Sequence, residues 1–600
     1  MISAIQPFDF QDASMRTVLE REFVSFDGVP LFYRHWPLHD AVATGTPRAV
    51  VLLHRGHEHS GRVMHLAEEL DMPDAQFFAW DARGNGRSPG VRGDAPGFEA
   101  LVRDLDSFIA HLRATHGIAV QDIVVIAQSV GAVVAATWVH DYAPSLRALV
   151  LASPAFKVKL YVPFARAGLA LLHALRGNFF VNSYVKPQWL THDPARAESY
   201  RTDPLITRPI SVRVLLGLYA AADRVVDDAQ AITVPTQLLV SGADVVVHRG
   251  PQDRFYENLR SPIKQRHWLP GFFHDTLGER DRAIAIAHIR QFVQVRFAQP
   301  PVRAALRNAH RAGPSFEEAE RLAWPPQRNS LQDLRWRGVR AGLRLGGKLS
   351  EGIALGLQTG FDSGSTLDYI YRNQAHGRGP LGRMIDRTYL NAIGWRGIRI
   401  RGSHLGELLR EAAARLRGAG KPVRVLDIAA GHGRYVLQAL GSGAQRADAI
   451  VLRDFSPPNV TQGTALIQAL GAGDIARFEQ GDAFDPAALA SVQPAPTLAV
   501  VSGLYELFAD NDQVARSLAG LAAAVQPGGY LLYTGQPWHP QLEFIARALT
   551  SHRDGVAWVM RRRSQQEMDG LVEAAGFRKV AQRIDAFGIF TVSMAQRVDA

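Results

Sequence analysis

Cysteine is absent from the sequence. Its absence excludes disulfide bonds, thiolate catalysis and metal centres with cysteine ligands. His54, His57 and His59 lie close together in the chain, but their spacing matches no established zinc pattern, so we expect no bound metal. Internal repeats are absent as well, and the two halves carry different motifs. We therefore expect a fusion of two unlike domains rather than a duplication.

Long apolar runs are also missing. No stretch of about 18 uncharged apolar residues occurs, so we expect no transmembrane helix. The N-terminal segment 1–22 carries four acidic residues and no apolar core typical of a secretory signal, so we expect no signal peptide. These features predict a cytoplasmic location. Peripheral contact with the inner face of the membrane is compatible with it.

The composition is that of a globular protein, with 47% hydrophobic and 21% charged residues. At 600 residues the chain is longer than one hydrophobic core usually serves, so we expect at least two domains. The net charge of +10 has two explanations, an arginine-rich background composition or attraction to an anionic membrane surface. We recognise no nucleic-acid-binding module, and a positive charge alone does not predict a nucleic-acid partner.

In the first half of the chain, short apolar segments alternate with helical patterns. After a hairpin at 22–36, we expect strands at 49–54, 77–81, 123–127, 146–152, 236–240 and 265–269, and helices near 61–71, 98–115, 131–141 and 281–296. This alternation predicts an α/β domain with a parallel, doubly wound sheet. A partly helical stretch rich in apolar residues, 156–230, interrupts it.

One of these expected strands ends at a serine. The apolar run from Val124 to Ala127 is followed by Gln128, Ser129 and small residues that begin a helical pattern. This is typical of a nucleophile elbow, G-x-S-x-G, with Ala127 in place of the first glycine. Taken alone, the segment is also compatible with an ordinary buried strand that leads into a helix.

The other members of a serine triad follow in the order expected of α/β-hydrolases. Asp244 and His274 each come just after an expected strand, at the sheet edge where sites of open parallel sheets are built. We predict Ser129 as the nucleophile, His274 as its base and Asp244 as the acid that orients the base. The amides of Gly56 and Val130 are the predicted oxyanion hole.

Residues 20–297 resemble the monoacylglycerol lipase and lysophospholipase group of α/β-hydrolases. The resemblance is carried by the elbow, Asp244, His274 and the segments His54–Arg62, Asp81–Ser88, Thr191–Pro194 and Asp203–Leu205. It implies the same triad, a helical cap at about 156–230 that shapes an acyl-chain pocket, and hydrolysis of lysophospholipid-like or monoacylglycerol-like esters. Arg55 departs from the usual glycine beside the oxyanion hole. It either recognises an anionic head group or crowds the hole.

Residues 298–364 have the composition of a linker followed by a basic helical segment. Three proline-containing pairs occur before residue 330, and the stretch 331–349 places four arginines among apolar residues at helical spacing. This helix either packs between the domains or lies on an anionic membrane surface.

A second α/β alternation begins near Val423. Its first strand ends at Asp427 and leads through a small-residue turn, with Gly431 and Gly433, into a helix. The acidic residue before the glycines distinguishes this turn from the dinucleotide fingerprint, in which the glycines come first. Further apolar segments follow at 449–454, 476–480, 498–501 and 521–525, before a glycine pair at 528–529.

This series resembles class I S-adenosylmethionine-dependent methyltransferases over about 365–595, which implies a Rossmann-like second domain at 365–600. S-adenosylmethionine is the implied cofactor. The implied contacts are Asp427, Ala429, Gly431 and Gly433 at its methionine end, Asp454 at the ribose, and Asp482 and Ala483 at the adenine. The blocks 369–374 and 381–387 resemble an N-terminal cover over such a site. The acceptor is left open, and Tyr371, Tyr505 and Glu506 are the candidate bases.

The sequence as a whole predicts a bifunctional enzyme of lipid metabolism, a serine hydrolase fused to a methyltransferase, with a small lipid-like substrate. The oligomeric state is left open. Two alternatives remain. In one, an esterase or thioesterase acts on a non-lipid metabolite that is also methylated. In the other, the chain is a lipid-surface binding protein with two inactive sites.

Overall fold

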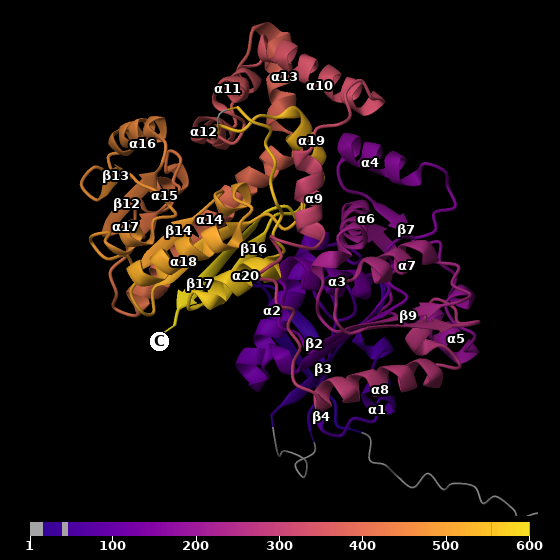
Figure 1. Cartoon of the computed structure of the whole chain (residues 1–600). Helices are drawn as coiled ribbons and strands as arrows, with labels where there is room; N and C mark the ends of the chain where they lie inside the picture. The colour runs from indigo at the N-terminus through magenta and orange to yellow at the C-terminus, as the bar shows by residue number, and fades with distance from the viewer. Residues whose placement is uncertain (1–15, 39–45, 554, 599–600) are drawn as a thin grey trace, which may run out of the picture. The chain divides into compact units, whose positions relative to one another are not determined.

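The structure, a computed structural model, describes residues 16–38, 46–553 and 555–598 (Figure 1). It divides into two compact units, Met1–Ala304 and Ala305–Ala600. Residues 1–15, to which most of the signal-peptide prediction refers, lie outside the described residues. Within the described residues, no helix is both long and apolar enough to cross a membrane.

The first unit is built on a mostly parallel sheet with the strand order β1-β2-β4-β3-β5-β6-β9-β10. Only the pairs β1·β2 and β2·β4 are antiparallel, and the first of them is the hairpin predicted at 22–36. The strands are β1 (Leu19–Val24), β2 (Pro30–Trp36), β3 (Arg48–Leu53), β4 (Ala75–Trp80), β5 (Ile123–Gln128), β6 (Ala148–Ala152), β9 (Thr236–Ser241) and β10 (Lys264–Leu269).

Helices cover both faces of this sheet. Alternate strand residues such as Val50, Val124 and Val150 pack against α1 (Leu66–Glu69) and α8 (Ala283–Ala298). On the other face Trp80 of β4 stacks on Phe108 of α2 (Phe98–His116), and α3 (Val130–Tyr142) packs on β5 and on α2. This side also carries α6 (Val212–Asp227), which packs on α2 and α3, and α7 (Arg249–Asn258) packs on α6.

A cap is inserted after β6, where the alternation of the sequence is interrupted. It contains α4 (Ala165–Arg176), the antiparallel pair of β7 (Phe180–Asn182) and β8 (Pro209–Ser211), and α5 (Pro194–Thr202) (Figure 1). Every residue of α4 remains at least partly exposed. In particular Phe164, which precedes the helix, is 89% exposed, and Leu175 is 74% exposed.

The second unit contains a mixed sheet with the strand order β13-β12-β11-β14-β15-β17-β16, in which β17 is antiparallel to both neighbours. The strands are β11 (Arg424–Asp427), β12 (Ala449–Asp454), β13 (Ala476–Gln480), β14 (Leu498–Val501), β15 (Tyr530–Gly535), β16 (Phe577–Ile584) and β17 (Thr591–Arg597). Two α/β units, one with the α/β-hydrolase fold, confirm the predicted fold class.

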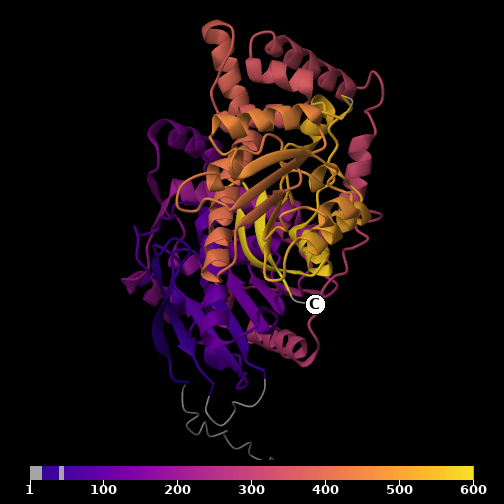
Figure 2. The same ribbon diagram turned by 90° about the vertical axis from the view of Figure 1, so that its left-hand side faces the viewer.

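Two helical layers enclose this second sheet. One layer consists of α14 (Ile393–Gly418), α15 (Arg434–Leu440) and α16 (Pro457–Ala469), with α14 lying along β15, β16 and β17 (Figure 2). The opposite layer consists of α17 (Pro486–Ala490), α18 (Asn511–Ala524) and α20 (Gln565–Ala574).

A further helical group lies in the same unit and has its own apolar core, which includes Leu322, Tyr369, Trp395 and Trp558. It contains α9 (Pro314–Ala323), α10 (Leu331–Gly347), α11 (Glu351–Thr359), α12 (Gly364–Arg372), α13 (Gly379–Leu390) and α19 (Leu542–Ala548). The segment 298–364, which the sequence assigns to a linker and a basic helical segment, supplies α9, α10 and α11 to the second unit. The basic helix expected at 331–349 is α10, which packs on α11 and α19 of that unit.

Two local predictions were wrong, and one pair of strands was missed. The helix expected at 61–71 is shortened to α1, because His59 caps a separate short turn at Ser60–Arg62. The apolar segment Leu521–Val525 is the end of α18 rather than a strand, since Val514, Leu518 and Leu521 are buried at helical spacing. The antiparallel pair of β16 and β17 was not predicted.

Candidate functional sites

Ser129 lies at a sharp turn between β5 and α3. Its backbone has φ 53° and ψ −115°, a conformation that is rare for a residue with a side chain. Hydrogen bonds hold the turn, because the Ser129 amide donates to the Ala152 carbonyl at 3.0 Å and its carbonyl accepts from the Ala155 amide at 3.1 Å. The turn is the predicted elbow, and Ala127 is accommodated in the buried end of β5.

Gly131 allows α3 to start against the end of β3. A Cβ atom at this position would lie 2.4 Å from the His54 carbonyl oxygen, which no side chain can accommodate. The helix therefore begins directly beside the loop that follows β3. A Cβ on Gly56, in that loop, would lie 2.9 Å from a methyl group of Val130. The two predicted oxyanion-hole residues are thus neighbours beside Ser129.

The structure brings the three predicted triad residues together. The His274 Nε2 lies 2.8 Å from the Ser129 hydroxyl, and the His274 Nδ1 lies 2.7 Å from one carboxylate oxygen of Asp244. These residues follow β5, β9 and β10, at the carboxyl edge of the sheet. All three are largely buried, so water has little access to the hydrogen bonds between them.

The environment of Asp244 keeps its carboxylate charged. Burial on its own raises the pKa of Asp244, but the interactions with His274 and with the amides of Val246 and Val247 together bring the pKa below its usual value. The second carboxylate oxygen accepts hydrogen bonds from the amides of Val246, at 2.7 Å, and Val247, at 3.0 Å. Asp244 is thereby fixed as the acceptor of the His274 Nδ1 proton, which leaves Nε2 free to accept a proton from Ser129.

Gln128 links the turn that carries Ser129 to the loop that carries His274. Its side-chain amide donates to the carbonyl of His274 and to the carboxylate of Asp275, both at 3.1 Å. The residue before the serine therefore holds the loop that carries the histidine. The sequence analysis did not identify this contact, and the signal for it was a buried polar residue at the end of an otherwise apolar strand.

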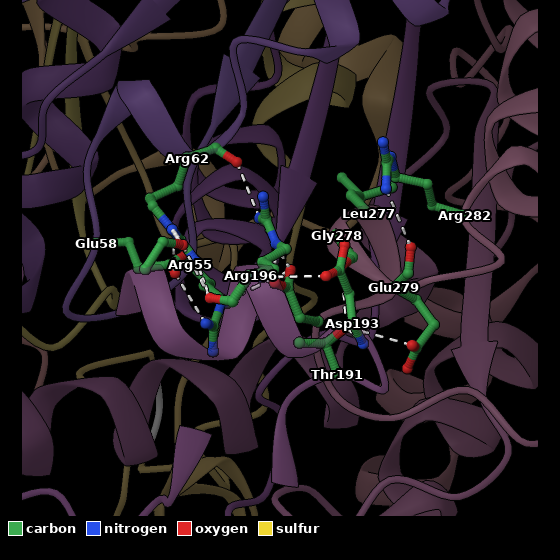
Figure 3. Close-up of polar contacts among 12 residues, drawn as sticks. Arg55, Glu58, Arg62, Thr191, Asp193, Arg196, Leu277, Gly278, Glu279 and Arg282 are labelled. Atoms are coloured by element: carbon green, nitrogen blue, oxygen red, sulfur yellow. Dashed lines mark hydrogen bonds and ion pairs between the residues drawn. The ribbon is translucent and has the colours of Figure 1, made fainter. Parts of the chain in front are cut away.

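The Arg55 side chain is engaged by two carboxylates, an arrangement not considered from the sequence. Its guanidinium is buried, donates to Glu58 at 2.8 Å and lies 3.8 Å from the Asp275 carboxylate. Glu58 also accepts from Arg62 at 3.1 Å (Figure 3). This pairing favours a structural role for Arg55. The acidic residue three positions along, Glu58, was the signal for this pairing.

The base of the cap is tied to the loop after His274. Arg196 of α5 donates to the Asp275 carboxylate at 2.5 Å. It also donates to the Arg62 carbonyl at 2.9 Å (Figure 3). Asp193 caps the start of α5, and Thr191 donates to the Gly278 carbonyl at 3.0 Å. Although burial raises the pKa of Asp275, Arg196 and Arg55 hold it well below its usual range.

In the second unit the small-residue turn lies between β11 and α15. Gly431 and Gly433 have φ 57° and 72°, and a Cβ on Gly433 would lie 2.3 Å from the Leu452 side chain. Asp454, at the end of β12, accepts from the Gly431 amide at 2.9 Å and so joins the turn to the neighbouring strand. Backbone and carboxylate groups thus converge at the carboxyl edge of the sheet.

A cavity of about 720 Å³ opens at this edge, and we name it the edge cavity. The predicted contact residues in its wall are Ala429, Gly431, Gly433, Asp454, Asp482 and Ala483. Asp427, the seventh predicted residue, lies behind the turn. It is fully buried and accepts from the Tyr435 hydroxyl at 2.5 Å and the Ala429 amide at 3.3 Å. Burial raises the pKa of Asp427 to about 7.

Further residues of the edge cavity were not identified from the sequence. Phe455 and Phe484 directly follow the predicted acidic and small residues and supply apolar faces to the wall. The helix α12 contributes Asp368 and Tyr371, in line with the predicted N-terminal cover. The sequence signal available for Phe455 and Phe484 was an aromatic residue directly after each strand-end motif.

The three candidate bases have different environments. Tyr371 lines the edge cavity. Tyr505 is buried, and its hydroxyl donates to Ser517 at 2.9 Å, away from any described cavity wall. Glu506 faces a second cavity beside the first. The short segment after β14 therefore directs Tyr505 into the core and Glu506 to a cavity.

Comparison with known proteins assigns families to both halves. Residues 289–597 match the family described as "Putative methyltransferase", and residues 45–281 match the family described as "Serine aminopeptidase, S33". The uncharacterized protein YnbC of Escherichia coli (strain K12) is 56% identical over 580 residues, which cover 97% of this chain and 98% of YnbC.

The hydrolase half has named relatives. The monoacylglycerol lipase of Mycolicibacterium smegmatis is 25% identical over 285 residues, which cover 46% of this chain and 96% of that protein. The solved structure of the Paleococcus ferrophilus monoacylglycerol lipase is 24% identical with a TM-score of 0.40, covering 44% of this chain and 99% of that one. The chain therefore belongs to the "Putative methyltransferase" family, and it carries in addition an N-terminal α/β-hydrolase domain that resembles monoglyceride lipases.

Proposed function

We propose that the first unit is a serine hydrolase of acyl esters. The observation that carries this proposal is the continuous chain of hydrogen-bonding distances from Ser129 through His274 to Asp244. His274 takes the proton of the Ser129 hydroxyl as the oxygen attacks the ester carbonyl, and then returns it to the leaving alcohol. The amides of Gly56 and Val130 stabilise the negative charge that develops on the carbonyl oxygen.

The preferred substrate is lipid-like, of the monoacylglycerol or lysophospholipid kind. The exposed apolar side chains around α4 support this choice, since Phe164, Leu171 and Leu175 are 89%, 61% and 74% exposed. Contiguous exposed apolar residues mark lipid or partner contacts more often than ordinary surface. The same face and the net charge of +10 support peripheral contact with an anionic membrane from the cytoplasmic side.

A fluorophosphonate probe tests the hydrolase half. We expect labelling of the wild type and none of Ser129→Ala; Ser153→Ala, a second buried serine near the same strands, is the matched control and retains labelling. A panel of monoacylglycerols, lysophospholipids and short p-nitrophenyl esters then tests the substrate class. Activity confined to the short soluble esters would favour a non-lipid metabolite, and absence of labelling in folded protein would refute the hydrolase.

We propose that the second unit binds S-adenosylmethionine in the edge cavity and transfers its methyl group. The wall fits this cofactor in chemistry. The main chain of the turn at Gly431 and Gly433 borders the methionine end, the Asp454 carboxylate accepts from the ribose, and Asp482 and Ala483, with Phe455, border the adenine. Two buried polar atoms of the wall, Ser502 Oγ and His432 Nε2, have no hydrogen-bond partner among the described residues.

Such unpartnered atoms are costly unless a ligand or water satisfies them, which supports a polar occupant. When bound, S-adenosylmethionine supplies an electrophilic methyl group on a sulfonium sulfur. The chain supplies the turn that admits it, the carboxylate that orients the ribose, and α12, which covers the cavity through Asp368 and Tyr371.

Isothermal titration calorimetry with S-adenosylmethionine tests this half. Gly431→Arg places a long side chain in the cavity wall and should abolish binding. Gly443→Arg is the matched control, because Gly443 also has a positive φ, 76°, but lies in an open loop where a Cβ would meet no atom within 4 Å. Equal binding by both variants would refute the assignment of the edge cavity.

A further inference from the structure

A second cavity, of about 380 Å³, lies beside the edge cavity in the same unit, and we name it the side cavity. The two cavities share part of their walls, including Leu367, Arg401 and Gly503. A ligand in the side cavity would therefore lie next to the occupant of the edge cavity, separated only by these shared residues. This adjacency is what a group-transfer site requires of its two substrates.

The wall of the side cavity is almost entirely apolar and rich in aromatic rings. It is built by α13, α14, α19 and the segment after α19, and its principal apolar residues are Ile385, Trp395, Ile398, Phe544, Trp558 and Met560. Trp395 and Trp558 stack with ring centroids 6.4 Å apart. Such a wall favours an apolar ligand, because each square ångström of apolar surface removed from water contributes about 25 cal/mol.

A few polar groups interrupt this apolar wall. The Glu506 side chain is 9% exposed, its Oε1 lies 3.4 Å from an Arg401 nitrogen, and its Oε2 has no hydrogen-bond partner among the described residues. The Gln536 side-chain nitrogen and the Trp558 indole nitrogen, also in the wall, have no partner within the described part of the chain. Buried polar atoms without partners each cost roughly 1–3 kcal/mol, so the site is built for a ligand with a polar group.

The titratable groups in the wall of the side cavity indicate what that polar group can be. Burial raises the pKa of Glu506, and Arg401 opposes this shift. His539, also in the wall, is neutral, because burial lowers its pKa to about 4. Its Nδ1 accepts from the Gln541 amide at 3.0 Å, which assigns the remaining proton to Nε2 and makes that nitrogen a donor. The site thus offers both an acceptor and a donor, which suits a hydroxyl group.

We propose that the side cavity binds the methyl acceptor, an apolar, ring-sized molecule that carries a hydroxyl group hydrogen-bonded to Glu506. This inference rests on the methyltransferase proposed above, and it adds the substrate class and the residue that receives the hydroxyl. The polar end lies at the wall shared with the edge cavity, where Arg401 and Glu506 meet, and the apolar body lies among Trp395, Ile398 and Trp558. Glu506 is here a binding residue that accepts the hydrogen of the ligand.

Equilibrium dialysis of the full chain with 2-naphthol and naphthalene tests the inference. Both probes are two-ring apolar molecules, and only the first carries a hydroxyl. A hydrogen bond to a buried carboxylate contributes about 1.5 kcal/mol or more, so wild type should bind 2-naphthol about tenfold more tightly than naphthalene. Glu506→Gln, which keeps the shape of the side chain but removes its charge, should reduce this preference at least threefold.

A second pair of variants separates specific binding from a folding effect. Ala392→Trp fills the side cavity from its half-buried position at the start of α14 and should weaken 2-naphthol binding at least tenfold. Ala419→Trp, at the exposed other end of the same helix, is the matched control and should bind as wild type. Equal binding by both variants, no preference for the hydroxyl in wild type, or no binding of either probe would overturn the inference.

Calorimetry with S-adenosylmethionine on the same samples distinguishes the two proposals. Cofactor binding without 2-naphthol binding would overturn the acceptor site and leave the proposed methyltransferase intact. Selective 2-naphthol binding without cofactor binding would overturn the methyltransferase and the acceptor role together. Binding of both, with loss of 2-naphthol alone in Ala392→Trp, supports both proposals.

Discussion

Replacement of Arg55 by methionine tests whether this buried cation is structural or recognises substrate. Arg55 is 5% exposed, and the side chains of its partners Glu58 and Asp275 are each 1% exposed. Methionine has a similar length and no charge, so the variant leaves two carboxylates in the interior with one cation fewer. We expect the first unit to lose stability and the substrate preference to remain unchanged.

The size of the loss follows from the remaining partners. Breaking a buried ion pair from one side costs about 3–5 kcal/mol. Glu58 keeps the Arg62 contact at 3.1 Å and Asp275 keeps the Arg196 contact at 2.5 Å, so we expect the lower end, about 3 kcal/mol. For a unit of about 300 residues, a loss of about 3 kcal/mol corresponds to a melting temperature lower by roughly 5 °C.

Differential scanning calorimetry measures the stability, and hydrolysis of a neutral monoacylglycerol and an anionic lysophospholipid measures the preference. Arg201→Met, which removes an exposed arginine paired only with Glu198, is the control and should shift the melting temperature by less than about 2 °C. If Arg55→Met melts like wild type but loses activity selectively on the anionic ester, the structural interpretation is refuted and Arg55 binds the head group.

Three further predictions follow from the two sites. Asp244→Asn should lower kcat for p-nitrophenyl esters by about 10⁴ with the fold retained, since His274 loses the acceptor that sets its tautomer; a loss below tenfold would contradict the triad. Gly131→Ala should cost about 1–3 kcal/mol and slow fluorophosphonate labelling, because its Cβ would lie 2.4 Å from the His54 carbonyl; unchanged labelling and melting would contradict this packing. The pKa of Asp427 is about 7 in the folded state and near 4 in the unfolded state. Between about pH 4 and pH 7 the folded state therefore keeps a proton that the unfolded state releases. The free energy of unfolding falls by up to about 4 kcal/mol over this range. Chemical denaturation at pH 5 and pH 8 should show a lower free energy of unfolding at pH 8 for the wild type and little difference for Asp427→Asn. A wild type that is more stable at pH 8 would contradict the predicted direction.

Much of the hydrolase fold was predictable because its buried strands are short apolar runs separated by helical patterns. The strands around Ser129, Asp244 and His274 were found in this way, and the order of motifs along the chain determined which residues to group. The last strands of the second unit were missed. Residues in β16 such as Arg578 and Lys579 give it a polar sequence, because one side of this edge strand is exposed.

Predictions of individual contacts were limited by partners distant in sequence. The two roles considered for Arg55 assumed that it faces the substrate, but Asp275, 220 positions later, draws it into the interior. The resemblance to methyltransferases implied that Asp427 borders the cofactor, and in the structure Asp427 accepts hydrogen bonds from Tyr435 and Ala429 behind the turn. In both cases local spacing indicated the correct loop but not the direction of the side chain.

The side cavity could not have been predicted from sequence patterns. Its wall combines residues from positions as distant as Leu343, in α10, and Phe590, directly before β17. Aromatic and aliphatic residues in these elements follow ordinary core periodicity, which gives no sign that they surround a space. Only Glu506, an acidic residue in the short segment after β14, carried a local signal.

The contact made by Gln128 has a consequence for how the first site responds to motion. One side chain, at the foot of the nucleophile, holds both the backbone and the neighbouring carboxylate of the histidine loop at 3.1 Å. A displacement of the end of β5 therefore carries that loop with it, and the separation between Ser129 and His274 changes less than the position of either. Because Arg196 of the cap helix α5 binds the same Asp275 carboxylate, the base of the cap shares this anchor, and a shift of α5 reaches the histidine loop and the reacting pair through Asp275.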